Sequence, residues 1–197
     1  MSEDAQSRFY EQEMAERAVR PLGPEREARV ADFLDCCSRR GLTSVVEVGC
    51  GAGRDGVLLR EGGMTYRGLD TSAASVRICA GLGLNAIQGS ARALPFDDDA
   101  FDAGWSMSTL MHLPGDGMAE ALAELRRVVR PDGIIDIGVW GAERTRQRVD
   151  EHGRLFYGRS DDDLMVLLRA VGEVVGFDTW DHYADGGYYQ CARILVR

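Results

Sequence analysis

The chain has 197 residues, of which 45% are hydrophobic and 28% are charged, and its formal net charge is −9. This length and composition predict a single soluble domain with a core of its own. An acidic chain without a basic run is a poor electrostatic partner for nucleic acid or anionic lipid, so neither is expected. No apolar run approaches the ~20 residues of a membrane span, and the first residues do not resemble a secretory signal peptide.

The residue types that usually bind metals are scattered along the chain. The five cysteines are irregularly spaced and contain no C-x-x-C pair, which predicts free thiols in a reducing cytoplasm. The three histidines lie far apart in sequence and lack metal-ligand spacing. The consecutive aspartates at 97–99 are expected to form a solvated loop. The sequence therefore predicts no metal site.

Two helices are predicted before the first strand. The first covers residues 5–20 and carries Phe9, Tyr10 and Met14 on one side. The second starts at Pro24, a residue that suits the first helical position, and runs to about residue 40.

Residues 44–56 read Ser-Val-Val-Glu-Val-Gly-Cys-Gly-Ala-Gly-Arg-Asp-Gly, and they are the strongest motif in the chain. The three valines predict a short buried strand. Glu47 interrupts them with a carboxylate that is costly to bury unless it is paired. Three alternating glycines then permit a sharp turn and a close approach to a ligand, and a helix starts near Arg54. This geometry aims free backbone N–H groups at a ligand.

The glycine motif does not identify its ligand. Gly51, Gly53 and Gly56 satisfy the dinucleotide fingerprint, and Asp70 follows at about the expected distance of ~20 residues. Alternatively, the glycines form a purely structural turn that binds no ligand. The glycine motif alone does not distinguish these interpretations, so the other motifs of the chain are needed.

The following segments alternate between strands and helices. Residues 65–69 predict a second strand that ends at Asp70, and Ser72 suits the N-cap of a helix over residues 73–80. A weak third strand is predicted at 84–88. An acid at the carboxyl end of the second strand lies at the crevice edge, where it can accept hydrogen bonds from a ribose diol, or it can simply cap the turn.

The second half of the chain continues this alternation and then changes it. A fourth strand is predicted at 101–107, a helix opens after Pro114 and Asp116, and a fifth strand covers 134–140. The polar, arginine-rich segment 141–159 is expected to be an active-site loop or insertion.

A helix and a hairpin are predicted to close the domain. Ser160 and Asp163 have the spacing of a helix capping box. Two strands at 174–183 and 188–196 flank a turn signal, Asp-Gly-Gly, that predicts a hairpin.

These elements predict an α/β fold. We expect a three-layer αβα sandwich with a seven-stranded, mainly parallel sheet and a C-terminal antiparallel hairpin. The chain is interpreted as one domain over 1–197. It divides into leading helices (1–40), a cofactor-binding core (44–140) and a substrate-side loop, helix and hairpin (141–197).

Several motifs together resemble the class I, Rossmann-like S-adenosylmethionine-dependent methyltransferases. An acid inside the first strand followed by Gly-x-Gly-x-Gly resembles their motif I. Gly-Ser-Ala at 89–91 with Leu-Pro-Phe at 94–96 resembles their segment after strand three. "Phe-Asp … His-Leu-Pro … Leu-Arg-Arg-Val-Val-Arg-Pro-Asp-Gly" extends the resemblance to residue 140. The implied activity is type 11-like methyl transfer to a small molecule.

The resemblance implies S-adenosylmethionine as methyl donor and S-adenosylhomocysteine as product. Glu47 would face the cationic amino group, Asp70 would take the ribose, and Ser106 would offer its carbonyl to the amine. Arg54 would reach the cofactor carboxylate or be solvated. Ser90 stands where the family commonly has an acid beside the adenine. The expected cofactor-binding residues are Glu47, Gly49, Cys50, Gly51, Gly53, Arg54, Asp70, Thr71, Ser90, Ala91 and Ser106.

On the substrate side, His112 is the histidine that the motif implies to lie near the transferred methyl group, as a general base or as packing. Tyr10 and Tyr157 are expected to face the substrate from segments that act as lids or pack on the sheet. Two other functions stay open at this point. One is an NAD(P)-dependent oxidoreductase, against which the closing hairpin and Glu47 weigh, and the other is a non-catalytic cofactor-binding partner subunit. The acceptor and the oligomeric state are not determined.

Overall fold

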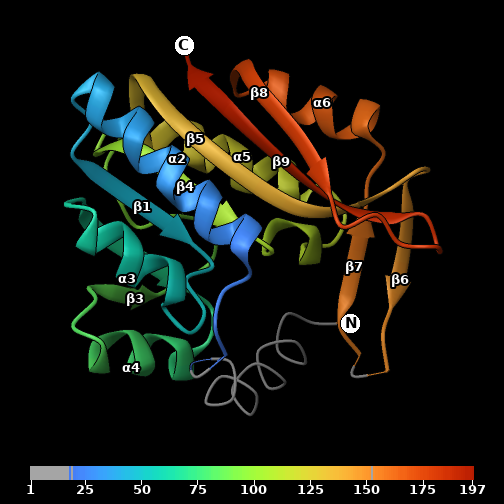
Figure 1. Ribbon diagram of the computed structural model, residues 1–197, viewed down its shortest axis with the longest axis horizontal. Helices are drawn as coiled ribbons and strands as arrows, with labels where there is room; N and C mark the ends of the chain where they lie inside the picture. The colour runs from blue at the N-terminus through green and yellow to red at the C-terminus, as the bar shows by residue number, and fades with distance from the viewer. Residues whose placement is uncertain (1–17, 19, 152) are drawn as a thin grey trace.

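The computed structural model describes residues 18, 20–151 and 153–197, and a seven-stranded sheet organises them (Figure 1). The strand order is β3-β2-β1-β4-β5-β9-β8. Neighbouring strands from β3 to β5 pair in parallel, whereas β9 is antiparallel to both β5 and β8. The predicted αβα fold with its closing antiparallel hairpin is therefore confirmed.

The strands are β1 (Ser44–Val48), β2 (Thr65–Asp70), β3 (Ala86–Gln88), β4 (Phe101–Met107), β5 (Val129–Ala142), β6 (Arg146–Val149), β7 (Leu155–Gly158), β8 (Gly172–Trp180) and β9 (Gly187–Val196). The helices are α2 (Pro24–Arg40), α3 (Arg54–Glu61), α4 (Ala73–Gly81), the 3-10 turn η1 (Leu110–His112), α5 (Gly117–Val128) and α6 (Asp161–Arg169). None of the helices in the described part of the chain is long and apolar enough to cross a membrane.

Two hydrophobic cores cover the two faces of the sheet. Because strand side chains alternate, Val45 and Trp105 pack with α2, α3 and α4, whereas Val46 packs with α5 and α6 on the opposite face. The Phe33 ring of α2 meets the Trp105 ring edge-on at 4.8 Å. The apolar residues whose spacing predicted these helices thus pack against the sheet, on both of its faces.

Both predicted N-caps are present, but the capping box at Ser160 is only half formed, because the Ser160 amide donates to the Thr145 hydroxyl and not to Asp163. The Ser72 hydroxyl accepts from the Ser75 amide at the start of α4, and the Ser160 hydroxyl accepts from the Asp163 amide at the start of α6. These bonds satisfy N–H groups that the first helical turn leaves without partners. They mark the first turns of α4, which follows β2, and of α6, which follows β7.

The fifth strand is longer than predicted. It starts at Val129, immediately after α5, and Asp132 takes a left-handed conformation with φ of 62° inside it. The register between β4 and β5 shifts after Phe101, which absorbs the Pro-Asp-Gly turn within the pairing. The Pro-Asp-Gly residues do turn the backbone locally. The strand nevertheless continues, because residues before and after the turn both pair with β4.

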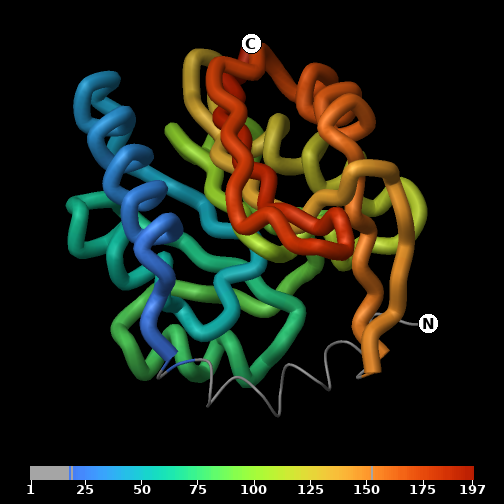
Figure 2. The backbone as a smooth tube through the Cα atoms, turned by 45° about the vertical axis from the view of Figure 1, so that its right-hand side comes forward, coloured from blue at the N-terminus to red at the C-terminus, as the bar shows by residue number. Residues whose placement is uncertain are grey.

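The segment 141–159, predicted as an active-site loop or insertion, is not an irregular loop. Residues 146–149 and 155–158 form an antiparallel hairpin, β6–β7, with its own two-stranded sheet beside the β8–β9 turn (Figure 2). All four β6 residues are exposed, so the strand has no apolar alternation to detect. Asp150 closes the hairpin turn, since its carboxylate accepts from the Arg154 amide and guanidinium.

Candidate functional site

A cavity of about 580 Å³ opens at the carboxyl ends of β1, β2 and β4. The turn after β1 forms its floor, η1 and the β6–β7 hairpin form one wall, and the start of α2 forms another. Crevices at this edge of open α/β sheets are where such folds bind ligands. Among the predicted residues, those that line it are Glu47, Gly49, Cys50, Gly51, Arg54, Asp70, Thr71, Ser90, Ala91 and His112.

The three glycines of the turn all have positive φ, but each serves a different purpose. A Cβ on Gly49 would lie 2.1 Å from the Thr109 hydroxyl, so this glycine admits the β4 loop. A Cβ on Gly53 would lie 2.8 Å from Leu84 beneath α4. A Cβ on Gly51 would meet no atom within 4 Å. A bound molecule can therefore approach the backbone most closely at Gly51.

Asp70 links the glycine turn to the end of β2. One carboxylate oxygen accepts from the Gly51 amide at 2.8 Å, and the other accepts from the Ser72 amide at 2.9 Å. Burial raises the pKa of this carboxyl, and the backbone hydrogen bonds oppose that rise. Its position is thus held from both sides before any ligand is bound.

Glu47 is a buried acid on the cavity floor. Only 3% of its surface is exposed, and the Tyr66 hydroxyl donates to it at 2.5 Å. Burial raises its pKa well above the usual range, and the nearby Asp55 carboxylate adds to the shift. A cationic group in the cavity would favour its ionised form.

A half-buried cation, Arg26 of α2, also lines the cavity. Its guanidinium donates to the Asp55 carboxylate at 2.5 and 2.8 Å and to the Tyr189 hydroxyl at 3.0 Å. The indole of Trp105 donates to the same Asp55 oxygen at 2.8 Å. Sequence reasoning missed Arg26, since its partners lie 29 and 163 residues away and no local pattern joins them.

His112 stands in η1, directly beyond β4, and is 8% exposed. Its Nδ1 lies 2.6 Å from the backbone carbonyl oxygen of Leu155 in β7. A carbonyl only accepts, so Nδ1 carries a proton, and the neutral form of the ring therefore has its lone pair on Nε2. The Phe156 ring meets the imidazole edge-on at 4.6 Å. The hairpin that sequence reasoning missed therefore orients this histidine.

Three predicted residues lie away from the cavity lining. The Ser106 side chain is buried and donates to the Val48 carbonyl at 2.8 Å, and Gly53 faces α4. Tyr157 packs under the Arg159 guanidinium at 5.2 Å, while its neighbour Phe156 lines the cavity. Because strand side chains alternate, only one of two adjacent aromatic residues can face inward.

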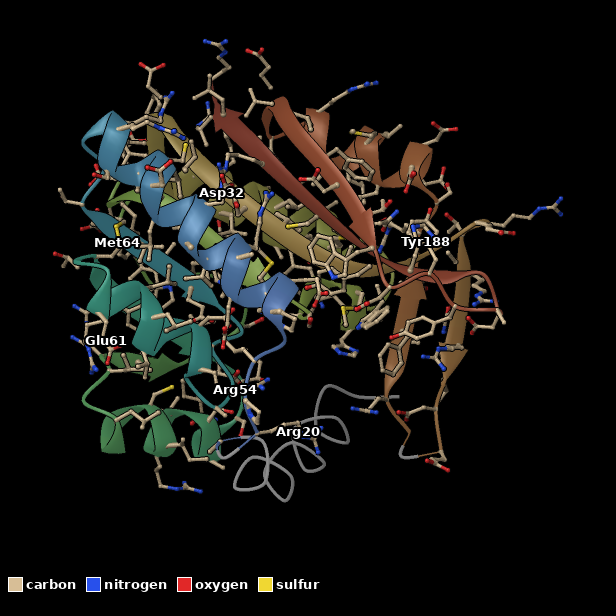
Figure 3. The ribbon with its side chains drawn as sticks, in the orientation of Figure 1. Arg20, Asp32, Arg54, Glu61, Met64 and Tyr188 are labelled. Carbon is tan, nitrogen blue, oxygen red and sulfur yellow. The ribbon has the colours of Figure 1, made fainter. Side chains whose placement is uncertain are left out.

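Arg54 fastens the segment before α2 to the site. Its guanidinium donates to the backbone carbonyls of Arg20 and Pro21, and Figure 3 labels Arg20 and Arg54 there. Tyr10, the remaining predicted residue, lies outside the described residues. Within those residues, no group of three or more His, Cys, Asp or Glu side chains could hold a metal ion.

Part of the chain is similar to a known protein family and to several curated methyltransferases. The family described as "Methyltransferase domain" matches residues 46–137. A tRNA (carboxymethyluridine(34)-5-O)-methyltransferase of Arabidopsis thaliana is 32% identical over 117 residues, which are 59% of this chain and 28% of that protein. A 2-methyl-6-phytyl-1,4-hydroquinone methyltransferase of Synechocystis is 32% identical over 111 residues, 53% of this chain and 34% of that protein. The chain thus spans about a third of the length of these relatives.

Among solved structures, a 1,6-didemethyltoxoflavin-N1-methyltransferase of Burkholderia thailandensis with bound S-adenosylhomocysteine shares the fold. It is 21% identical, with a TM-score of 0.69, and the match covers 90% of this chain and 92% of that one. The matched family, the strand order and the cavity at the glycine turn agree with one another. The chain is thus similar to the methyltransferase-domain family over residues 46–137 and shares the fold of this solved S-adenosylhomocysteine-bound methyltransferase.

Proposed function

We propose that this protein transfers a methyl group from S-adenosylmethionine to a small-molecule acceptor. The observation that carries the proposal is the floor of the 580 Å³ cavity. There the open Gly51 backbone lies beside an acid, Asp70, that two backbone amides already orient. The Gly51 backbone and the Asp70 carboxylate together suit a ligand that carries an amino-acid group at one end and a ribose beside it.

The residues present suit this cofactor. Asp70 uses one lone pair on each oxygen for the backbone, which leaves the others for the two ribose hydroxyls. Glu47 offers a buried carboxylate to an ammonium group, and ionisation of Glu47 would offset part of the cost of burying that cation. Thr71, Ser90 and Ala91 lie at the same cavity and are proposed to border the adenine.

When bound, the cofactor would supply an activated methyl group on a sulfonium. The protein then needs mainly to orient the acceptor toward that methyl group and to take a proton from the acceptor. We assign the proton transfer to His112. Its Nδ1 proton is engaged by Leu155, so Nε2 is the atom that can accept a proton from an acceptor O–H or N–H group. His112 would then hold the proton released by the acceptor as an imidazolium.

A small acceptor is favoured over nucleic acid by the net charge of −9. The Synechocystis and Burkholderia thailandensis proteins carry small-molecule acceptors in their names, whereas the Arabidopsis relative acts on tRNA. The cysteines of the described residues are free thiols, which supports a cytoplasmic location. The division of residues 1–197 into one domain stays a prediction.

Calorimetric titration separates this proposal from the oxidoreductase alternative. We expect S-adenosylhomocysteine to bind with a Kd at or below the micromolar range and NAD not to bind. Measurable NAD affinity without S-adenosylhomocysteine affinity would refute the proposal. Binding of S-adenosylhomocysteine without turnover on any acceptor would instead favour a non-catalytic partner subunit.

A further inference from the structure

A second cavity of about 470 Å³ adjoins the first one. It lies between the β6–β7 hairpin and the β8–β9 turn, which run side by side in Figure 2. Trp140 and Phe156 line both cavities, so the two spaces meet at these rings. The second cavity is lined by Trp140, Gly141, Arg146, Arg148, Phe156, Gly158, Tyr183, Asp185 and Gly187.

The register of the hairpin selects which side chains face this cavity. Arg146 is paired with Gly158 and Arg148 with Phe156, and residues two apart on a strand share a face. The Arg148 guanidinium lies over the Phe156 ring, 4.7 Å from its centroid. Two arginines and one aromatic ring therefore share one face of the hairpin.

The charges at the cavity do not balance. Arg146 pairs with the Asp185 carboxylate at 3.3 Å, and that carboxylate also accepts from the Gly187 amide. Within the described part of the chain, no carboxylate lies within ion-pair distance of Arg148. One cation thus remains at the cavity in a chain whose net charge is −9. A guanidinium over a ring keeps its N–H groups available to an anion.

The other walls are aromatic. The Trp140 and Tyr183 rings lie 5.5 Å apart at 39°, and Tyr183 is 55% exposed although it is a large aromatic side chain. Flat, partly exposed rings favour a planar ligand, because offset and edge-on ring contacts add to simple burial. Phe156 also touches His112 on the side of the first cavity.

We propose that the second cavity binds the methyl acceptor and that the acceptor is a planar aromatic molecule with an anionic group such as a carboxylate. Its ring lies against Trp140 and Phe156, its anionic group meets Arg148, and its reacting end points past Phe156 to His112. This inference rests on the proposed function. It adds the acceptor class and a binding role for Arg148.

The test compares 2-naphthoate with its neutral analogue 2-naphthamide, titrated into the chain saturated with S-adenosylhomocysteine. The carboxylate probe should bind about tenfold or more tightly than the amide, since a charge-assisted hydrogen bond is worth that much. R148Q should remove this preference and leave naphthamide and S-adenosylhomocysteine affinities unchanged. R144Q makes the same charge change at an exposed residue outside the cavity and should keep the preference.

Three outcomes overturn the inference. They are equal affinity for both probes, no measurable binding of naphthoate, and equal loss of naphthoate binding in R148Q and R144Q. Retention of a tRNA probe in a gel-shift assay, weakened equally by both substitutions, would indicate a general polyanion surface and also overturn it. S-adenosylhomocysteine affinity is measured separately. If the cofactor product fails to bind while the Arg148-dependent preference persists, the proposed function fails and the anion site stands.

Discussion

His112 and Leu155 are joined by a hydrogen bond of 2.6 Å between the imidazole Nδ1 and the backbone carbonyl, across 43 residues of chain. The bond fixes the ring in one tautomer and ties the residue after β4 to the β6–β7 hairpin. A proposed general base is thus oriented by a backbone atom of the hairpin, and the Phe156 ring packs against it edge-on.

Replacement of His112 tests its role as base. His112→Gln retains a hydrogen-bond donor for Leu155 but no basic atom, and His112→Ala removes both. If Nε2 takes the proton, both variants should lower the rate of S-adenosylhomocysteine formation with the acceptor by about 10²–10⁴-fold. Cofactor affinity should stay within a few-fold in each. Substantial activity in the glutamine variant alone would assign His112 to shaping the cavity.

We expect Glu47 to lower the folding stability of the protein and to strengthen its binding of S-adenosylhomocysteine. Its pKa is raised in the folded state, so the folded chain holds this proton more tightly than the unfolded chain does. The group therefore lowers stability progressively as pH rises from the unfolded pKa of about 4.3 toward its higher folded value. Glu47→Gln should raise Tm at neutral pH, by roughly 2–4 °C for each kcal/mol relieved, and weaken S-adenosylhomocysteine binding.

The gain from Glu47→Gln should shrink as the pH falls below about 4, because both states of the wild-type acid are then neutral. Thermal scans at several pH values measure this. Tyr66→Phe is the matched variant: it removes the 2.5 Å hydrogen bond but keeps the carboxylate, and should lower Tm. A pH-independent difference between wild type and Glu47→Gln would contradict the assignment.

Gly49 and Gly51 form a matched pair for the glycine turn. Gly49→Ala places a methyl 2.1 Å from the Thr109 hydroxyl at φ of 81°, so we expect a loss of roughly 2–4 kcal/mol in stability. Gly51→Ala meets open space and should lose only about 1–2 kcal/mol for its left-handed φ of 50°. It should instead weaken S-adenosylhomocysteine binding. Denaturant unfolding and calorimetry separate the two effects.

Asp55 should be the costliest acid to remove from the buried network. Asp55→Ala leaves the Arg26 guanidinium and the Trp105 indole without their shared acceptor, and breaking such a pair costs about 3–5 kcal/mol. The double change Arg26→Met with Asp55→Leu should recover part of this loss in urea unfolding. Equal destabilisation by the single and double variants would show that lost packing, and not the unpaired charge of Arg26, causes the loss of stability.

Local pattern determined much of this protein. The valines of β1, the alternating glycines and the caps at Ser72 and Ser160 act over a few residues, so their sequence alone predicts the elements and their order. The position of Asp70 was predictable in the same way, because it ends a parallel strand and the ligand crevice of such sheets lies at the carboxyl ends of their strands. The closing hairpin was likewise visible in its turn residues and alternating strands.

Only the tertiary structure decided which side chains enter the site from the second half of the chain. The β6 strand carries no apolar period, so its pairing depends on backbone bonds to β7, and that register turns Phe156 inward and Tyr157 outward. Arg26 reaches the site because α2 packs beside α3, whose first turn holds Asp55. Contacts between segments far apart in the chain set these positions, and short-range preferences carry no information about them.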